Sequence, residues 1–184
     1  MERIDLATYK KDNNNFSEKK FLSCNNQING TFTIENGEYD ILFANLKSNE
    51  KMHLEIKDSA DVRMSFFAKN ELENMDVIID VYESSSVEIY FADFSFGMNN
   101  INFLINLKNP FAKANFHLAS LTSREDKKVF NISVAHEAKN TSAKVDNYGV
   151  CKDASKLLFA GTSSINKGCV ESSTYQSAKI MVFD

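Results

Sequence analysis

A repeat of strand, polar corner and strand constrains this chain of 184 residues more than any other feature. Residues 56–66 read IKDSADVRMSF, and residues 81–91 read VYESSSVEIYF, 25 positions later. Residues 107–117 form a looser third copy, LKNPFAKANFH, after a further 26 positions. A repeat of this length indicates a solenoid, in which each copy is one coil and the stacking of coils buries a continuous core.

The residues between the corners alternate between apolar and polar, as strands with one buried face do. Met52, Leu54 and Ile56 share one face of a strand, whereas His53 and Glu55 share the other. Similar short runs follow to the end of the chain, separated by turns that contain glycine or small polar residues. No segment between the strands has the length and period of an ordinary helix, which argues against a helical or leucine-rich repeat.

These patterns predict an all-β fold, a right-handed parallel β-helix built as a single-stranded solenoid over residues 21–184. Residues 1–20 are polar, and we expect them to form a loose leader with at most one helical turn. An antiparallel β-sandwich with coincidental spacing is the alternative that the repeat leaves open.

Charge and composition narrow the possible partners. The net charge is −4, and the basic residues are scattered as Lys19-Lys20, Arg124 and Lys127-Lys128. We interpret them as a solvated face, because nucleic-acid or anionic-membrane binding requires clustered cations. The N-terminus has no apolar signal segment, and no run reaches the ~20 apolar residues of a membrane span. We therefore expect a soluble, cytoplasmic protein.

The reactive side chains form no recognisable catalytic or metal motif. Cys151 and Cys169 are 18 positions apart, and a β-helix could bring them together on neighbouring coils. With His136 they are weak metal candidates; we favour buried structural thiols and a structural histidine, because no C-x-x-C supplies further ligands. Cys24 is isolated, and His53 and His117 occupy outward positions without a signal. The sequence therefore predicts no catalytic residue and no resident cofactor.

An ordered set of short motifs lies between residues 136 and 184. It consists of His136, Thr141-Ser142, Gly149-Val150, Phe159-Ala160-Gly161, Gln176 followed by Ser177, and an apolar strand from Ile180 to Asp184. In order and spacing, this set resembles the conserved block of the SufB and SufD family of iron–sulfur cluster assembly proteins, whose core is a β-helix. The upstream repeats fit that β-helix but carry no specific motif of the family.

The resemblance implies a role in the Suf system, where SufB and SufD form a scaffold with the ATPase SufC and hold a transient iron–sulfur cluster. In SufB a cysteine follows the glutamine, whereas here Ser177 does. A hydroxyl is neither a soft metal ligand nor a persulfide carrier, so this departure points to a SufD-like or degenerate member. In the family, further coils and a helical domain that docks SufC follow the final aspartate. We expect both to be absent here, because the sequence ends at Asp184, so that the chain is either a naturally short relative or an isolated core.

We predict a scaffold-like protein that acts through protein–protein contacts and is not an enzyme. The open end of a β-helix exposes unpaired backbone, so the edge at residues 180–183 should pair with a second copy or with a SufB/SufD-type partner. Two other classes remain open. One is a self-assembling structural β-helix of the bactofilin kind; the other is a carbohydrate-acting β-helix enzyme, for which the sequence shows no cluster of charged residues and no Trp.

Overall fold

The computed structural model describes residues 5–8, 19–24, 29–44 and 46–183, and these residues contain strands and no helix. The strands are β1 (Asp5–Thr8), β2 (Lys19–Cys24), β3 (Gly30–Ile34), β4 (Gly37–Phe43), β5 (Glu50–Ile56), β6 (Ala60–Ala68), β7 (Asn74–Val81), β8 (Ser86–Asp93), β9 (Met98–Leu107), β10 (Lys113–Thr122), β11 (Lys127–His136), β12 (Ser142–Lys152), β13 (Lys156–Ile165) and β14 (Ser173–Phe183). The predicted all-β class is therefore confirmed.

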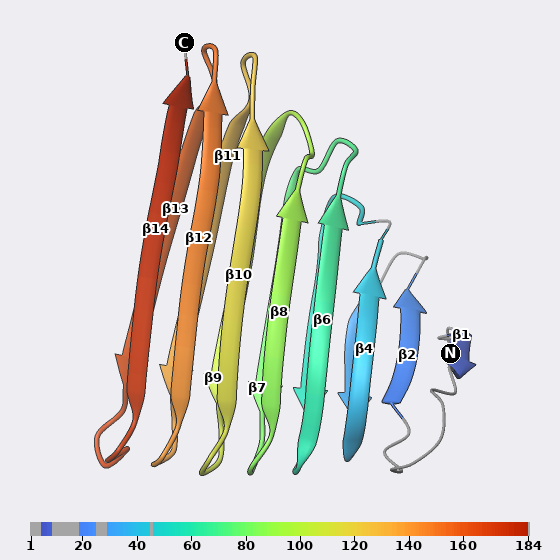
Figure 1. The fold of residues 1–184 in the computed structure, drawn as a ribbon, viewed down its shortest axis with the longest axis vertical. Coiled ribbons are helices and arrows are strands. Elements are labelled where there is room, and N and C mark those ends of the chain that lie inside the picture. Colours follow the sequence, from blue (N-terminus) through green and yellow to red (C-terminus); the bar gives the residue numbers. More distant parts are fainter. Residues whose placement is uncertain (1–4, 9–18, 25–28, 45, 184) are drawn as a thin grey trace.

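The strands form two facing sheets, and successive strands from β2 onward alternate between them (Figure 1). One sheet has the order β1-β2-β4-β6-β8-β10-β12-β14, and the other has the order β13-β11-β9-β7-β5-β3. Within the described residues every pair of neighbouring strands is parallel except β1 and β2, which are antiparallel. Each coil contributes one strand to each sheet, so the fold is the predicted parallel β-helix and not a β-sandwich.

The coils lengthen along the chain. At the N-terminal end Lys19 of β2 pairs with Glu38 of β4, whereas at the C-terminal end Ser142 of β12 pairs with the more distant Ser173 of β14. The predicted repeat corresponds to the middle coils, because the register of β5 with β7 and of β7 with β9 reproduces its two offsets. The third copy looked looser because β10 is displaced by one further position along the chain, pairing Lys113 with Ser86. The period is therefore not fixed, and the strands grow longer towards the C-terminal coils.

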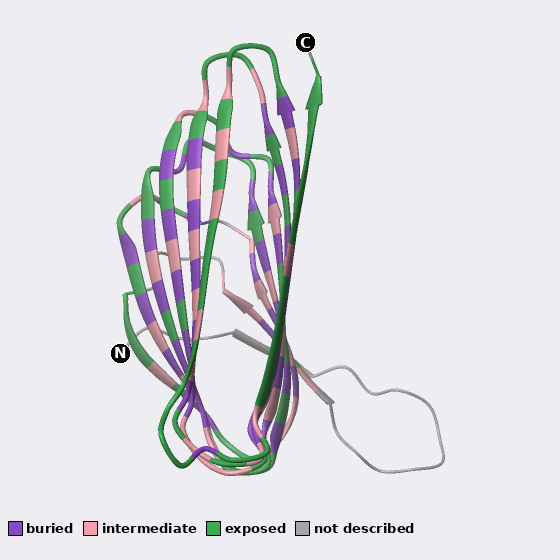
Figure 2. Cartoon of the chain, turned by 90° about the vertical axis from the view of Figure 1, so that its left-hand side faces the viewer, coloured by how far each residue is buried: buried purple, intermediate pink, exposed green. Residues whose placement is uncertain are grey.

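Alternation along each strand places every second side chain in the interior. Figure 2 shows this as alternating buried and exposed segments on both sheets. Five fully buried phenylalanines occupy the centre: Phe66, Phe91, Phe103, Phe116 and Phe130. Their rings touch across the two sheets, with centroids 4.9 Å apart for Phe103 and Phe116. Aligned aromatic and aliphatic side chains thus fill the core from coil to coil.

At three corners between the sheets, one residue has the left-handed backbone conformation. Ser59, Ser84 and Asn140 have φ of 61°, 56° and 58°, although none of them is glycine. Each donates its backbone N–H to a carbonyl of the next coil, as Ser59 does to Glu83 at 2.9 Å. The stacked corner therefore holds each residue in a conformation that an isolated chain rarely adopts.

The polar leader is only partly described. Residues 5–8 form β1 beside β2, where we had expected a loose segment with at most one helical turn. Strand β2 begins at Lys19, before the predicted start of the domain at Phe21. Residues 1–4 and 9–18 lie outside the described part of the chain. In the part that is described, no helix is long and apolar enough to cross a membrane.

Candidate functional site

The predicted motif residues gather on the last coils, where the interior changes character. In the middle coils the inward-facing side chains are large and apolar. In the last coil the inward positions of β13 and β14 include Gly161, Ser163, Thr174 and Gln176, all of which are at least partly exposed. The family-motif positions therefore mark the place where the apolar core gives way to an open end with polar side chains among its inward positions.

Two of the motif glycines provide space for their neighbours. A Cβ on Gly149 would overlap the side chains of Leu157 and Phe159, which come from the facing sheet. A Cβ on Gly161 would overlap the amide of Gln176. Neither glycine has a positive φ, so both are required by close approach of side chains and not by backbone conformation.

Gln176 and Ser177 point to opposite sides of β14. The Gln176 Nε2 donates to Ser163 Oγ inside the coil, and Ser163 Oγ lies 3.0 Å from Thr174 Oγ1. Ser177 faces outward, where its Oγ donates to Asp146 Oδ1 at 2.7 Å. Ser177, for which the sequence resemblance predicts the position of the SufB cysteine, is thus on the outer surface of the eight-stranded sheet.

The outer surface around Ser177 carries a compact charged group. Asp146 accepts from Lys144 Nζ at 2.7 Å, and His117 Nδ1 lies 3.6 Å from the same carboxylate oxygen, Oδ2. The hydrogen bond from Lys144 lowers the pKa of Asp146, and the bond from Ser177 acts in the same direction. The carboxylate is therefore held in its charged form, which suits a structural role better than proton transfer.

His136 is fully buried at the end of β11. Its Nδ1 lies 2.7 Å from Thr141 Oγ1, while its Nε2 has no hydrogen-bond partner among the described residues. Burial lowers the pKa of the imidazole, so the ring is neutral at pH 7. Asn147 Oδ1 and Thr122 Oγ1 are also buried without a partner in the described part of the chain. The closed interior next to the open end therefore holds polar atoms that its own side chains do not satisfy.

The structure does not bring the two weak cysteine candidates together. Cys151 lies near the end of β12, and Cys169 lies in the turn between β13 and β14. The whole of β13 separates them, about 30 Å of extended chain. Both thiols are buried and free, and the described residues contain no group of three or more His, Cys, Asp or Glu side chains that could hold a metal ion. Within one chain the two thiols cannot ligate the same ion.

A buried ion pair was missed by the sequence analysis. Lys128, which we had assigned to a solvated face, points inward, and its side chain and that of Asp93 are both 0% exposed. Its Nζ donates to Asp93 Oδ2 at 2.7 Å and to the carbonyls of Ser95 and Leu121 at 2.6 and 2.8 Å. The signal was available, because Lys128 has the same parity as Phe130 and the other inward residues of β11. The assignment of Lys128 to the surface was wrong.

Fold and site together define a parallel β-solenoid whose last coil has both polar and apolar inward-facing side chains and is open at its end. The family model described as "SUF system FeS cluster assembly, SufBD core domain" matches residues 33–184, and the chain therefore belongs to the SufBD family. No curated protein and no solved structure gives a significant match. The predicted resemblance is confirmed, and it extends well upstream of the motif block.

Proposed function

We propose that the chain acts in SUF-type iron–sulfur cluster assembly as a SufD-like scaffold, through protein contacts and not as an enzyme. Its membership of the SufBD family supports a role in this pathway. Ser177 supports the SufD-like assignment, because it stands where SufB has a cysteine and its hydroxyl is engaged by Asp146 on the outer surface. A hydroxyl in this place cannot carry sulfur by thiolate chemistry.

The proposal of protein contacts rests on the open end of the last coil. Strands β13 and β14 lie at the edges of their sheets, and each has a hydrogen-bonded neighbour on one side only. Figure 2 shows β14 exposed along nearly its whole length. Large apolar side chains are accessible along these two strands and the turn that joins them: Leu158, Ile165, Val170, Tyr175, Ile180, Met181, Val182 and Phe183. Such an edge favours strand pairing with another chain.

The proposed partner is a second SufBD-type coil, in a second copy of this chain or in a SufB/SufD-type protein. In a two-fold dimer, β14 of each copy would pair antiparallel with the other, and the same surface would be buried twice. Val182 belongs to the inward-facing set of β14 and is 71% exposed. A dimer that covers the coil end would bury this side chain.

Light scattering coupled to size-exclusion chromatography tests the proposal. We expect a species of twice the 20.8 kDa of one chain, and we expect Val182→Lys to shift it to the monomer. Met98→Lys is a matched control, because Met98 is also 71% exposed but begins β9, away from the coil end. A wild-type monomer that also fails to bind a SufB/SufD-type partner would refute the proposal. Species much larger than a dimer would favour the bactofilin-like alternative.

Anaerobic reconstitution with iron and sulfide tests cluster binding separately. Because Cys151 and Cys169 lie at opposite ends of the coil, we expect no charge-transfer absorption that depends on both thiols. A band in the wild type that disappears in the Cys151→Ser/Cys169→Ser double variant would contradict this. It would show that thiols from two chains, or a rearranged coil, hold the cluster.

A further inference from the structure

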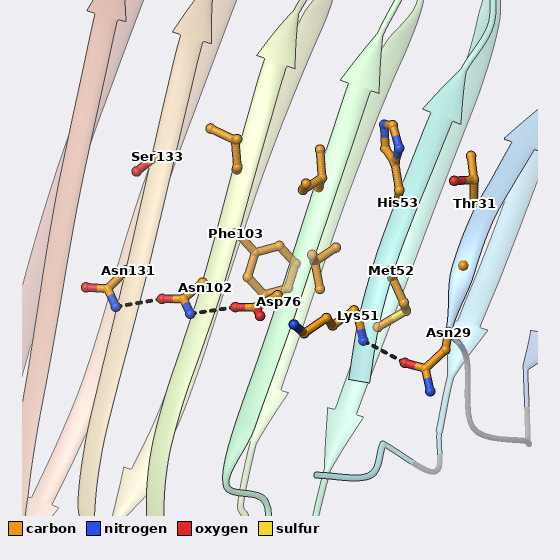
Figure 3. A pocket seen from close by; sticks show the side chains of 14 residues that line it. Asn29, Thr31, Lys51, Met52, His53, Asp76, Asn102, Phe103, Asn131 and Ser133 are labelled. Carbon is orange, nitrogen blue, oxygen red and sulfur yellow. Dashed lines mark hydrogen bonds between the residues drawn. The ribbon is translucent and has the colours of Figure 1, made fainter. Parts of the chain in front are cut away.

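An open groove of about 820 Å³ lies on the outer face of the six-stranded sheet, away from the motif residues. Five strands, from β3 to β11, contribute side chains to it, and Figure 3 shows them side by side across the sheet. At ~4.8 Å between strands, the groove extends about 19 Å along the solenoid axis. Its length therefore suits an extended ligand that lies across the strands.

A ladder of amide and carboxylate groups forms one side of the groove. Asn131 Nδ2 donates to Asn102 Oδ1, and Asn102 Nδ2 donates to Asp76 Oδ1, each at 2.7 Å (Figure 3). Three polar groups along the row have no hydrogen-bond partner among the described residues: the Oδ1 of Asn131, the second N–H of Asn102 and the Oδ2 of Asp76. Acceptors and a donor alternate from coil to coil, and a hydroxyl group can satisfy either kind.

An apolar ridge runs beside this ladder. Ile78 and Leu104 are register partners on β7 and β9, and they are 38% and 39% exposed. His53, the register partner of Ile78, continues this row on β5, and its Nε2 lies 2.9 Å from Asp80 Oδ2. The groove thus places a row of polar side chains beside a row that contains apolar side chains. A sugar ring has the matching form, with apolar C–H faces and a rim of hydroxyl groups.

The charges in the groove are opposed in sign. Lys51, on β5, is the register partner of Asp76, on β7, and both line the groove. No surplus of either sign is available among these described residues to attract a polyanion or a polycation. A neutral ligand fits this arrangement better than nucleic acid or a charged polymer.

We infer that this groove binds a neutral, linear oligosaccharide laid across β5, β7, β9 and β11. The ladder of Asn131, Asn102 and Asp76 contacts the hydroxyl rim, and Ile78 and Leu104 contact the ring faces. This site is separate from the coil end and from the SUF role, and it involves binding without a chemical step.

Titration calorimetry with cellohexaose as the probe tests the inference. We expect saturable binding to the full chain, and we expect an Asn102→Ala/Asn131→Ala double variant to weaken it by about tenfold or more, because it removes two polar contacts. Ile78→Asn should also weaken binding while leaving the ladder intact. Asn115→Ala is the matched control, since Asn115 is exposed on the outer face of the other sheet, and it should leave the affinity unchanged.

Two further probes check the ligand class. Maltohexaose has the same sugar in a curved chain and should bind more weakly than cellohexaose, because the groove is straight. A heparin-derived hexasaccharide should not bind better than cellohexaose. The inference is overturned by an absence of saturable binding to cellohexaose, by unchanged affinity in both the double variant and Ile78→Asn, or by preference for the heparin fragment.

Discussion

Replacing Lys128 with methionine should destabilise the protein far more than the replacement of a solvated lysine would. Methionine keeps most of the apolar stem and removes only the ammonium group. That group is fully buried and makes three hydrogen bonds, to the carboxylate of Asp93 and to the carbonyls of Ser95 and Leu121. The three bonds are 2.6–2.8 Å long, so each N–H of the ammonium group has an acceptor near the corner between β10 and β11.

The expected cost follows from what remains after the substitution. Removing one partner of a buried ion pair leaves an uncompensated charge and typically costs about 3–5 kcal/mol. Asp93 still accepts hydrogen bonds from the hydroxyls of Ser95 and Ser120, which moderates the loss. The two carbonyls lose their donor, which adds to it at roughly 1 kcal/mol each. We therefore expect the free energy of unfolding to fall by about 3–5 kcal/mol, a large part of the ~5–15 kcal/mol of an ordinary domain.

Urea unfolding followed by far-ultraviolet circular dichroism measures this loss. The control is Lys127→Met, since Lys127 is the exposed neighbour on the same strand, and it should change the free energy of unfolding by less than about 0.5 kcal/mol. At the melting temperature the Lys128 variant should lose roughly 6–20 °C. A Lys128→Met variant that is no less stable than Lys127→Met would refute the buried ion pair and the inward orientation of the lysine.

Three smaller effects should follow from the same structure. Gly149→Ala should lower the free energy of unfolding by about 1–3 kcal/mol, because it forces a methyl group against Leu157 and Phe159. In urea unfolding, the double variant with Leu157→Ala should lose less stability than the two single variants together, and full additivity would contradict the overlap. Because burial lowers the pKa of His136 below 6.5, the unfolded chain takes up a proton that the folded chain does not. The contribution of His136 to the free energy of unfolding is therefore fully present above about pH 6.5 and should decrease at lower pH, by at most ~1.4 kcal/mol per pH unit. In thermal melts recorded over a range of pH, the His136→Asn variant should not show this decrease. Burial also raises the pKa of the Cys24 thiol, so iodoacetamide at pH 8 should modify it more slowly in the native chain than in urea; equal rates would count against its burial.

The class of fold could be read from local patterns. Alternation of apolar and polar residues specified which side chains face inward, and the spacing of the three repeat copies matched the register of β5, β7 and β9. The motif glycines and Gln176 could also be identified from the sequence, because they follow one another along a single stretch of the chain. These features depend on neighbours in sequence or on one coil, so the chain itself displays them.

The lateral arrangement of side chains was decided by the tertiary structure. The row of Asn131, Asn102 and Asp76 exists only because coils of different length stack in one register. The same stacking places Cys151 and Cys169 at opposite ends of a coil and brings the inward-facing Lys128 into contact with Asp93. A sequence shows the order of residues along a coil, whereas the contacts between coils depend on the number of residues in each corner. Since the coils lengthen from the pairing of β2 with β4 to that of β12 with β14, no fixed period could have predicted those contacts.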